Sequence, residues 1–214
     1  VAHSIESLPP KERKFLWSLI DVHDEGEIIS ELHDEIQQEL VSEISSEELV
    51  NIISDLELDE IVDILQILPN KKTENILSAM SQRDRQRIQE ALEYPEDSAG
   101  GLMNTDIISV RPKHNLEVVM RYLRAQRELP KNTDQIFVVS RENKYLGSLP
   151  ISMIIVSDPS LNVRELMETE TQPLEAYLND KDVSRLFEQN DWVSAPVVDD
   201  ESRLIGRITI DDVV

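Results

Sequence analysis

The sequence predicts an all-α, superhelical (solenoid-like) domain followed by a tandem pair of α/β domains. Three observations predict this fold. Apolar residues recur every twelve residues from residue 9 to residue 92, the pair Gly100-Gly101 marks an abrupt change of composition, and a strand and helix pattern after it occurs twice, 59 residues apart. The chain has 214 residues, 40% of them hydrophobic, which is enough for about one to three domains.

The twelve-residue repeat predicts short helices. The last apolar position of each repeat is Ile20, Leu32, Ile44, Leu56, Leu68, Met80 and Leu92, and the residue four places earlier is apolar each time. One straight helix would turn this apolar stripe by about 120° every twelve residues. The chain must therefore turn in each repeat, and we expect stacked helices of about eight to ten residues over residues 1–97. The expected breaks lie near Pro9-Pro10, Gly26, Ser45-Ser46 and Pro69-Asn70.

Beyond the Gly pair, which is expected to be a linker or joint, the pattern changes to alternating strands and helices. The first copy, within residues 98–160, is predicted to contain strand Ile107–Val110, helix Leu116–Gln126, strands Gln135–Val139 and Tyr145–Leu149, and helix Ile151–Val156. The second copy, within residues 161–214, is predicted to contain strand Pro173–Tyr177, helix Asp180–Asn190, strands Ala195–Val198 and Arg203–Ile208, and a helix from Ile210 onward.

Composition disfavours several classes of function. The net charge of -22 would repel nucleic acid, whose binding depends on clustered Lys and Arg. The absence of Cys removes disulfides, thiolate metal sites and thiol catalysis. No apolar run approaches the roughly 18 to 20 residues that span a bilayer, and no signal peptide is recognised, so we expect the chain as given to be soluble. The four His show no zinc-ligand spacing and no catalytic motif is present, so we expect no enzymatic activity.

The acidic residues are concentrated in the helical part. Between Lys14 and Lys71 there are sixteen Asp and Glu residues and no Lys or Arg. Pairs of like charge one helical turn apart, such as Glu27 with Glu31 and Asp59 with Asp63, each cost roughly 0.2 to 0.5 kcal/mol. The stretch therefore indicates a surface that cations would stabilise.

Two motifs carry a resemblance to known families. Ala195-Pro196-Val197-Val198-Asp199, a turn with Leu204-Ile205-Gly206, and Thr209-Ile210-Asp211-Asp212 together resemble a cystathionine-β-synthase (CBS) domain pair. The segment from Tyr94 to Met103, preceded by acidic helices and followed by the CBS pair, resembles the cytosolic region of the MgtE family of magnesium transporters. This resemblance covers essentially all 214 residues.

The MgtE resemblance implies a function for the chain. It implies a cytosolic regulatory region that dimerises through its CBS domains at the inner face of the cell membrane. A transmembrane pore domain would follow the second CBS domain, so the chain would stop at Val214 as that region begins. Mg2+ would bridge acidic groups of the helical and CBS domains and favour a closed pore. The implied metal ligands are Asp59, Asp63, Asp212, Asp211, Asp191, the carbonyl of Gly101, and Glu27.

The CBS resemblance leaves a second function open. CBS domains often bind adenosine nucleotides through a Thr or Ser hydroxyl and an Asp three residues later. Thr209 and Asp212 match this pattern, and Trp192 offers a ring on which a base could stack. The equivalent residues of the first copy, Pro150 and Met153, cannot make those hydrogen bonds. The alternative is therefore an adenine-nucleotide-sensing module that regulates an enzyme or another partner protein.

Overall fold

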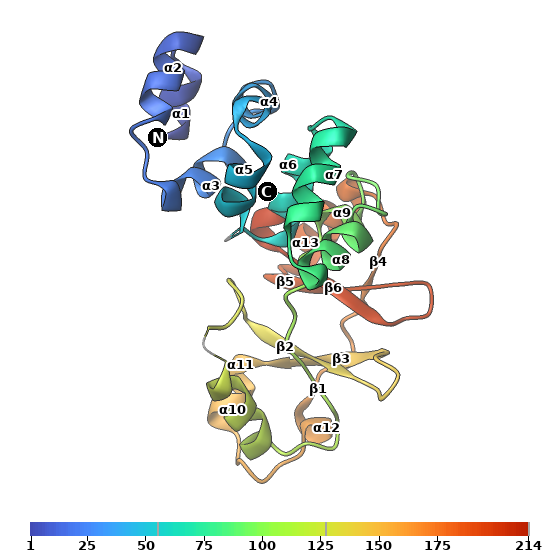
Figure 1. Cartoon of the computed structure of the whole chain (residues 1–214). Coiled ribbons are helices and arrows are strands. Elements are labelled where there is room, and N and C mark those ends of the chain that lie inside the picture. Colours follow the sequence, from blue (N-terminus) through green and yellow to red (C-terminus); the bar gives the residue numbers. More distant parts are fainter. Residues whose placement is uncertain (55, 127, 214) are drawn as a thin grey trace. The chain divides into compact units, whose positions relative to one another are not determined.

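A computed structural model of the chain describes residues 1–54, 56–126 and 128–213, without the side chain of Asp34. The chain divides into two compact units, Val1–Glu93 and Tyr94–Val214. The first unit is helical and the second contains all of the β-sheet (Figure 1). The predicted fold class, an all-α domain followed by a CBS-like α/β pair, is confirmed.

The first unit consists of short helices that begin at regular intervals. They are α1 (Ala2–Glu6), α2 (Pro10–Trp17), α3 (Val22–Ser30), α4 (Asp34–Glu43), α5 (Ser46–Ile53), α6 (Leu58–Gln66), α7 (Asn70–Ala79) and α8 (Gln82–Ala91). From α2 to α8 each helix begins twelve residues after the previous one. From α3 to α8 the packing partners are two helices apart, in the pairs α3 with α5, α4 with α6, α5 with α7 and α6 with α8, whereas α1 packs on α2. The apolar repeat thus lines two clusters, one around Ile28, Leu32 and Leu40 and a larger one in which Ile53, Ile64 and Ile76 are fully buried.

One expected helix break is wrong. Gly26 lies in the middle of α3, not between helices. A Cβ atom at this position would lie 2.6 Å from the carbonyl oxygen of Ile52 on α5. Gly26 therefore allows two helices to approach closely. The breaks expected near Pro9, Ser45 and Pro69 are confirmed by the starts of α2, α5 and α7.

A side chain at the fourth position of several helices stabilises the end of an earlier helix. Its donor reaches the carbonyl oxygen eight residues back: Arg13 to Ile5 at 3.3 Å, Gln37 to Ile29 at 3.0 Å, Thr73 to Leu65 at 3.2 Å and Arg85 to Leu77 at 2.7 Å. The last carbonyls of a helix lack the N–H four residues on as a partner. Those of Ile5, Ile29 and Leu65 each accept the N–H three residues on, at 3.2, 3.1 and 3.3 Å, so the side-chain donor adds a second hydrogen bond to them.

Lys72 stabilises another helix end. Its ammonium group donates to the carbonyl oxygens of Val41, Ser42 and Ile44, at 2.6, 3.0 and 2.5 Å, where α4 ends. Burial lowers the pKa of Lys72, so these three bonds also offset a desolvation cost. A cation at the negative end of a helix dipole adds to this stabilisation.

We expect Lys72→Met to lower the free energy of unfolding by about 1 to 2 kcal/mol, because the aliphatic stem is kept while the three hydrogen bonds are lost. Lys71→Met is the matched control, because Lys71 is exposed and adjacent. Urea denaturation followed by circular dichroism measures both. Equal stability of the two variants would show that Lys72 does not hold the end of α4.

The second unit contains the doubled α/β pattern. Its elements are α9 (Ala99–Leu102), β1 (Ser109–Val110), α10 (Leu116–Ala125), β2 (Gln135–Val139), β3 (Tyr145–Pro150), α11 (Ile151–Val156), α12 (Val163–Leu166), β4 (Leu174–Glu175), α13 (Asp180–Asn190), β5 (Ser194–Val198), β6 (Leu204–Thr209) and the 3-10 helix η1 (Ile210–Asp212). The two sheets have the orders β1-β2-β3 and β4-β5-β6, each with one parallel and one antiparallel pair. The predicted strands at 107–110 and 173–177 are shorter than expected, and Val214 lies outside the described residues.

Each copy contributes residues to the core of the other. The Gly pair does not form a linker: it lies in α9, whose Ala99 and Gly100 N–H groups donate to the carbonyls of Leu178 and Ala176 at 2.8 and 2.7 Å. Ala99 is therefore buried in the core of the second copy. In the same way Val163, at the start of the second copy, is buried in the core of the first.

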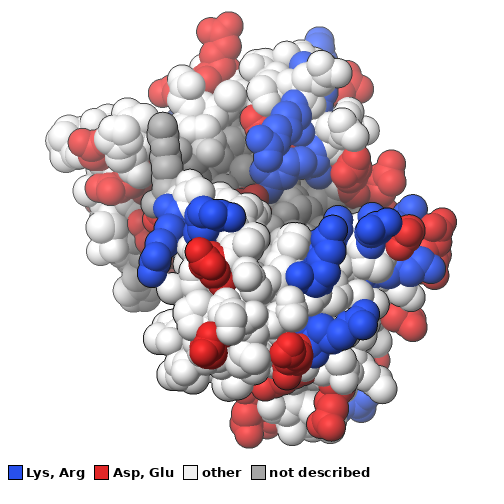
Figure 2. All heavy atoms as spheres, turned by 90° about the horizontal axis from the view of Figure 1, so that it is seen from below, with Lys and Arg blue, Asp and Glu red and all other residues white. Residues whose placement is uncertain are grey.

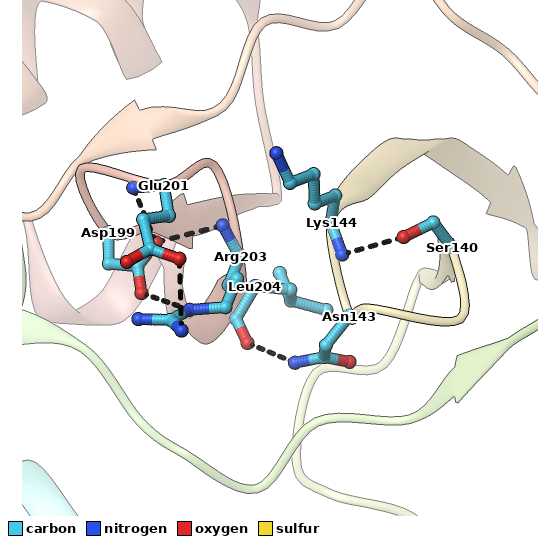
Figure 3. Close-up of polar contacts among 7 residues, drawn as sticks. All are labelled: Ser140, Asn143, Lys144, Asp199, Glu201, Arg203 and Leu204. Carbon is cyan, nitrogen blue, oxygen red and sulfur yellow. Dashed lines mark hydrogen bonds and ion pairs between the residues drawn. The ribbon is translucent and has the colours of Figure 1, made fainter.

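The turns of the two β-hairpins are also joined (Figure 3). Asn143 and Ser202, 59 residues apart, both have positive φ angles, of 63° and 61°. Tyr145 N–H donates to the Ser202 carbonyl, and Leu204 N–H to that of Asn143, both at 2.9 Å. The Asn143 amide adds a 2.8 Å bond to the Leu204 carbonyl. These contacts and the exchanged core residues hold the two copies together as one unit.

Candidate cation-binding surfaces

Asp59 and Asp63 lie on α6, one helical turn apart. A capping box begins the helix, in which the Glu57 N–H donates to the Glu60 carboxylate at 2.8 Å. Burial of Ile61, Ile64 and Leu65 orients the helix, so Asp59 is half-buried and Asp63 is exposed. Asp59 and Glu60 lie in the first turn, where the helix dipole favours negative charge. The expected pair of carboxylates on one helix is present.

Glu27, the other candidate on the first unit, is exposed on α3, while its neighbours Ile28 and Ile29 are buried. Among the residues that the structure describes, no three His, Asp or Glu side chains gather closely enough to hold a metal ion. Within this unit the candidates are therefore the half-buried Asp59 and the exposed Asp63 on α6, and the exposed Glu27 on α3.

Asp211 and Asp212 are fixed by hydrogen bonds at the end of β6. The N–H and hydroxyl groups of Thr209 donate to Oδ2 of Asp212 at 2.8 and 2.9 Å, and Thr209 itself is buried. The side-chain amide of Asn132, from the first copy, donates to Oδ2 of Asp211 at 2.5 Å. These bonds orient two adjacent carboxylates on a short 3-10 helix.

Asp191 and Trp192 lie where α13 ends. Asp191 is exposed and adopts the left-handed conformation, with φ 51° and ψ 41°, which terminates the helix. Trp192 packs edge-on against Phe187, with ring centroids 5.7 Å apart. It lines two cavities of about 540 and 630 Å³, which share Glu170 and Asn190. Thr209 lines neither of these cavities, so they do not bring the two proposed nucleotide-binding residues together.

Gly101 is buried in α9, where its N–H donates to the Ser98 carbonyl at 2.9 Å. A Cβ atom here would lie 2.4 Å from the carbonyl oxygen of Pro95 and 2.7 Å from that of Glu96. The position therefore requires Gly for packing, whatever its carbonyl binds.

Sequence reasoning did not single out Glu25. This side chain is only 8% exposed, and burial, followed by the nearby carboxylates of Glu48 and Asp21, raises its pKa. No hydrogen bond or ion pair to its carboxylate occurs among the residues that the structure describes. The signal that reveals it is the repeat: Glu25 is the fourth residue of α3, the position at which α2, α4, α7 and α8 carry a hydrogen-bond donor.

A pKa raised in the folded state has a defined consequence for stability. The stabilisation associated with the protonated form of Glu25 is fully present below the usual pKa of Glu and is lost as pH rises through the folded-state pKa. We therefore expect Glu25→Gln, in chelator, to raise the free energy of unfolding at neutral pH by about 1 kcal/mol. The gain should shrink as pH falls toward the usual range of Glu. Urea denaturation across this pH range tests it, and a gain that does not depend on pH would contradict it.

Charge is distributed unevenly between the two halves of the chain. Residues 101–214 contain 13 of the 21 Lys and Arg residues. Figure 2 shows one face of the molecule, on which Lys and Arg side chains are interspersed with Asp and Glu. The first 100 residues contain 24 Asp and Glu against 8 Lys and Arg, so this part of the chain would attract cations most strongly.

Comparison with known proteins connects these surfaces to a family. The family model of the MgtE intracellular N domain matches residues 1–97, and the CBS domain model matches residues 99–157 and 163–214. The chain belongs to the CBS-domain family and carries an MgtE intracellular N domain. The predicted resemblance to MgtE is confirmed.

Two curated relatives are MgtE magnesium transporters. The protein of Thermus thermophilus is 34% identical over 132 residues, which are 62% of this chain and 29% of that protein. The protein of Bacillus subtilis is 25% identical over 131 residues, which are 61% of this chain and 29% of that protein. The matched region thus spans less than a third of either MgtE relative.

Two solved structures are similar over nearly the whole chain. A crystal structure of the cytosolic domain of the Mg2+ channel MgtE in complex with ATP has a TM-score of 0.83 and 28% identity, covering 99% of this chain and 92% of that one. The soluble part of a magnesium transporter has a TM-score of 0.85 and 21% identity, covering 99% and 84%, and shares the fold. In the described part of our chain, no helix is both long enough and apolar enough to cross a membrane.

Proposed function

We propose that this chain is the cytosolic, Mg2+-sensing regulatory region of a magnesium transporter or channel. The observation that carries the proposal is the similarity of 99% of the chain to the cytosolic domain of the Mg2+ channel MgtE. In the full protein, the region would lie at the inner face of the membrane, continue into a pore domain and dimerise through its CBS domains. It would regulate ion flow and catalyse no reaction.

The candidate ligands fit the chemistry of Mg2+. This ion prefers six oxygen ligands, retains several waters and takes only one or two carboxylates directly. Asp59 and Asp63 offer carboxylates on α6, and Asp211 and Asp212 offer carboxylates on η1. Asp191, Glu27 and the Gly101 carbonyl are the further proposed ligands. A bound Mg2+ supplies positive charge that two acidic surfaces can share.

In this proposal, Mg2+ changes the conformation because it offsets the repulsion between the acidic residues of the helical unit and those of the CBS pair. Without Mg2+ the acidic helical unit and the acidic end of the CBS pair repel one another, which favours separated units. Bound ions screen and bridge them, which favours the compact state that closes the pore. A shift of the population from 1:99 to 99:1 requires about 5.5 kcal/mol of differential binding, which several weak sites can supply together.

Limited proteolysis tests the proposal on this chain. We expect cleavage in the segment that joins the units, around Tyr94–Ser98, to slow when millimolar Mg2+ replaces chelator. Sodium chloride at equal ionic strength serves as the control, because it screens charge without bridging it. Equal cleavage rates in Mg2+, chelator and sodium chloride would contradict ion-driven closure.

A second candidate function is adenine-nucleotide sensing by the CBS pair. The two cavities beside Trp192 favour it, and the similar MgtE structure is a complex with ATP. Among the described residues, the two cavities are lined by Glu168, Glu170 and Glu175 but by no Lys or Arg. The negatively charged triphosphate would therefore enter together with its Mg2+. Calorimetry with ATP in Mg2+, compared with Trp192→Ala, tests this. If the parent chain binds ATP tightly and its protease cleavage does not change in Mg2+ alone, the chain is better described as a nucleotide-sensing module of an enzyme or partner protein.

A further inference from the structure

We propose that Asn132 and Arg207 are positioning residues, which hold the carboxylate of Asp211 in the orientation from which it binds Mg2+. The inference rests on the proposed function and adds to it a role for the first CBS copy. A turn of that copy would set the Mg2+ affinity of a ligand that belongs to the second copy. Three features support it: a hydrogen bond between the copies, a buried guanidinium group that fixes the turn, and a difference from the equivalent end of the first copy.

The side chain of Asp211 is held by a residue of the other copy. Its Oδ2 atom accepts the 2.5 Å hydrogen bond from the Asn132 amide. Among the described residues, Oδ1 of Asp211 accepts no hydrogen bond, so we assign this oxygen to the ion. A carboxylate that binds a metal is commonly hydrogen-bonded in this way, and loss of the donor typically costs about 10- to 100-fold in metal affinity. Asn132 would therefore act on the ion through Asp211.

The turn that carries Asn132 is fixed by Arg207 of β6. This Arg is only 4% exposed, and its guanidinium group donates to the carbonyl oxygens of Lys131 and Asn132, at 2.5 and 3.4 Å. Its Nε atom has no hydrogen-bond partner among the described residues. A buried charge is costly unless it is hydrogen-bonded, so the two carbonyls are held close to the guanidinium group. Arg207 thus restricts the movement of Asn132 and, through it, of Asp211.

The equivalent end of the first copy has different residues at these positions. Residues 59 positions apart are equivalent, because β3 and β6 have the same register on their partner strands. Asp191 is the equivalent of Asn132, and both have a positive φ angle, of 51° and 52°, three residues before a strand. Ser148 stands in place of Arg207, is fully buried, and its hydroxyl has no hydrogen-bond partner among the described residues. Ser152 stands in place of the carboxylate.

This difference separates the needs of the fold from those of the ligand. The first copy forms its sheet with Ser148 at the position of Arg207, so the CBS fold does not require a guanidinium group there. The guanidinium group and the amide donor occur together at the end of the pair that carries the adjacent carboxylates of Asp211 and Asp212. We therefore assign both groups to the orientation of the ligand.

Asn132→Gly is the first test variant, because Gly adopts a positive φ without strain and removes the amide. Protease cleavage of the joint around residues 94–98 is followed as a function of Mg2+ concentration, and urea unfolding is followed in chelator. We expect the variant to need about tenfold more Mg2+ for half-maximal protection. Asn143→Gly is the matched control, because Asn143 also has a positive φ and donates its amide to the other copy, at the Leu204 carbonyl. It contacts no candidate ligand and should keep the Mg2+ dependence of the parent.

Arg207→Ser tests the second step, because it introduces the residue that the first copy has at this position. We expect it to shift the Mg2+ dependence in the same direction as Asn132→Gly. Since both residues act through Asp211, the double variant should need no more Mg2+ than the more affected single variant. Additive shifts would show that Arg207 acts independently of the turn, which would overturn its positioning role.

The remaining outcomes distinguish this inference from the proposed function. If Asn132→Gly is protected at the same Mg2+ concentration as the parent, the amide does not orient the ligand, and the proposed function stands without it. If Asn143→Gly is shifted equally, the effect comes from loosening of the CBS pair and the inference is wrong. If the parent itself shows no protection by Mg2+, the proposed function fails and this role fails with it.

Discussion

Replacing both Asp59 and Asp63 by Ala should raise the Mg2+ concentration needed for compaction at least about tenfold, which corresponds to a loss of about 1.4 kcal/mol of ion binding. The two residues lie one turn apart on α6 and are the ligands that the helical unit contributes to the proposed Mg2+ bridge. Their removal relieves a like-charge pair worth roughly 0.2 to 0.5 kcal/mol. We therefore expect the helical fold to remain intact, and a lost response would not reflect unfolding.

Glu74→Ala with Glu93→Ala is the matched control. Both residues are exposed on the same unit, so the control removes the same charge from a different part of the surface. If the Asp59 and Asp63 variant compacts at the same Mg2+ concentration as the parent, these residues do not form the bridge. If the control is equally impaired, the response depends on total charge and not on ligation.

Gly101→Ala should destabilise the CBS pair by about 2 to 3 kcal/mol. The added methyl group meets two backbone carbonyl oxygens, of Pro95 and Glu96, at 2.4 and 2.7 Å. Because backbone atoms cannot move aside as a flexible side chain can, the segment before α9 must shift. Denaturation followed by Trp192 fluorescence, with Trp17→Phe to silence the other indole, reports on this unit.

Gly206→Ala provides the comparison for Gly101→Ala. A Cβ at Gly206 first meets Sδ and Cγ of the buried Met103 side chain, at 2.7 and 2.9 Å, and meets a backbone atom, the Asn104 carbonyl oxygen, only at 3.0 Å. Met is an adaptable side chain, so it can relieve more of this clash than backbone can. We expect a smaller loss of stability than for Gly101→Ala. An equal or larger loss would show that the backbone around Gly101 adapts more readily than its contacts suggest.

The helical unit could be predicted closely from the sequence, because each repeat carries its own signals. The apolar positions fix the buried face, and residues such as Ser45 and Ser81 accept the Glu48 and Asp84 N–H groups at the start of their helices. The strands of the second unit followed from the same kind of local evidence. Such features lie within about one helical turn and are visible in the chain itself.

The errors arose where Gly serves a contact between distant segments. Gly26 was expected to break a helix, and the pair Gly100-Gly101 to form a linker. Both lie in helices and allow close packing, against Ile52 in the first case and against residues 94–96 in the second. Sequence shows that Gly is present but not which distant atoms approach it. The exchange of Ala99 and Val163 between the two cores is invisible for the same reason.

The candidate site was predicted only in part. The positions of Asp59 and Asp63 on one helix, and of Asp211 and Asp212 beside Thr209, follow from local spacing. Their role as ion ligands remains a proposal. Glu25 is one of sixteen acids in a stretch without bases, and only alignment of the helices shows that it occupies a buried donor position.

Small-angle X-ray scattering of the whole chain, in chelator and in millimolar Mg2+, is the most direct test of Mg2+-driven closure. The ionic strength must be matched with sodium chloride, because screening alone weakens repulsion between exposed charges. We predict that Mg2+ decreases the radius of gyration and that sodium chloride does not reproduce the decrease. A radius of gyration that is the same in chelator and in Mg2+ would contradict the proposal that this region senses Mg2+ by closing.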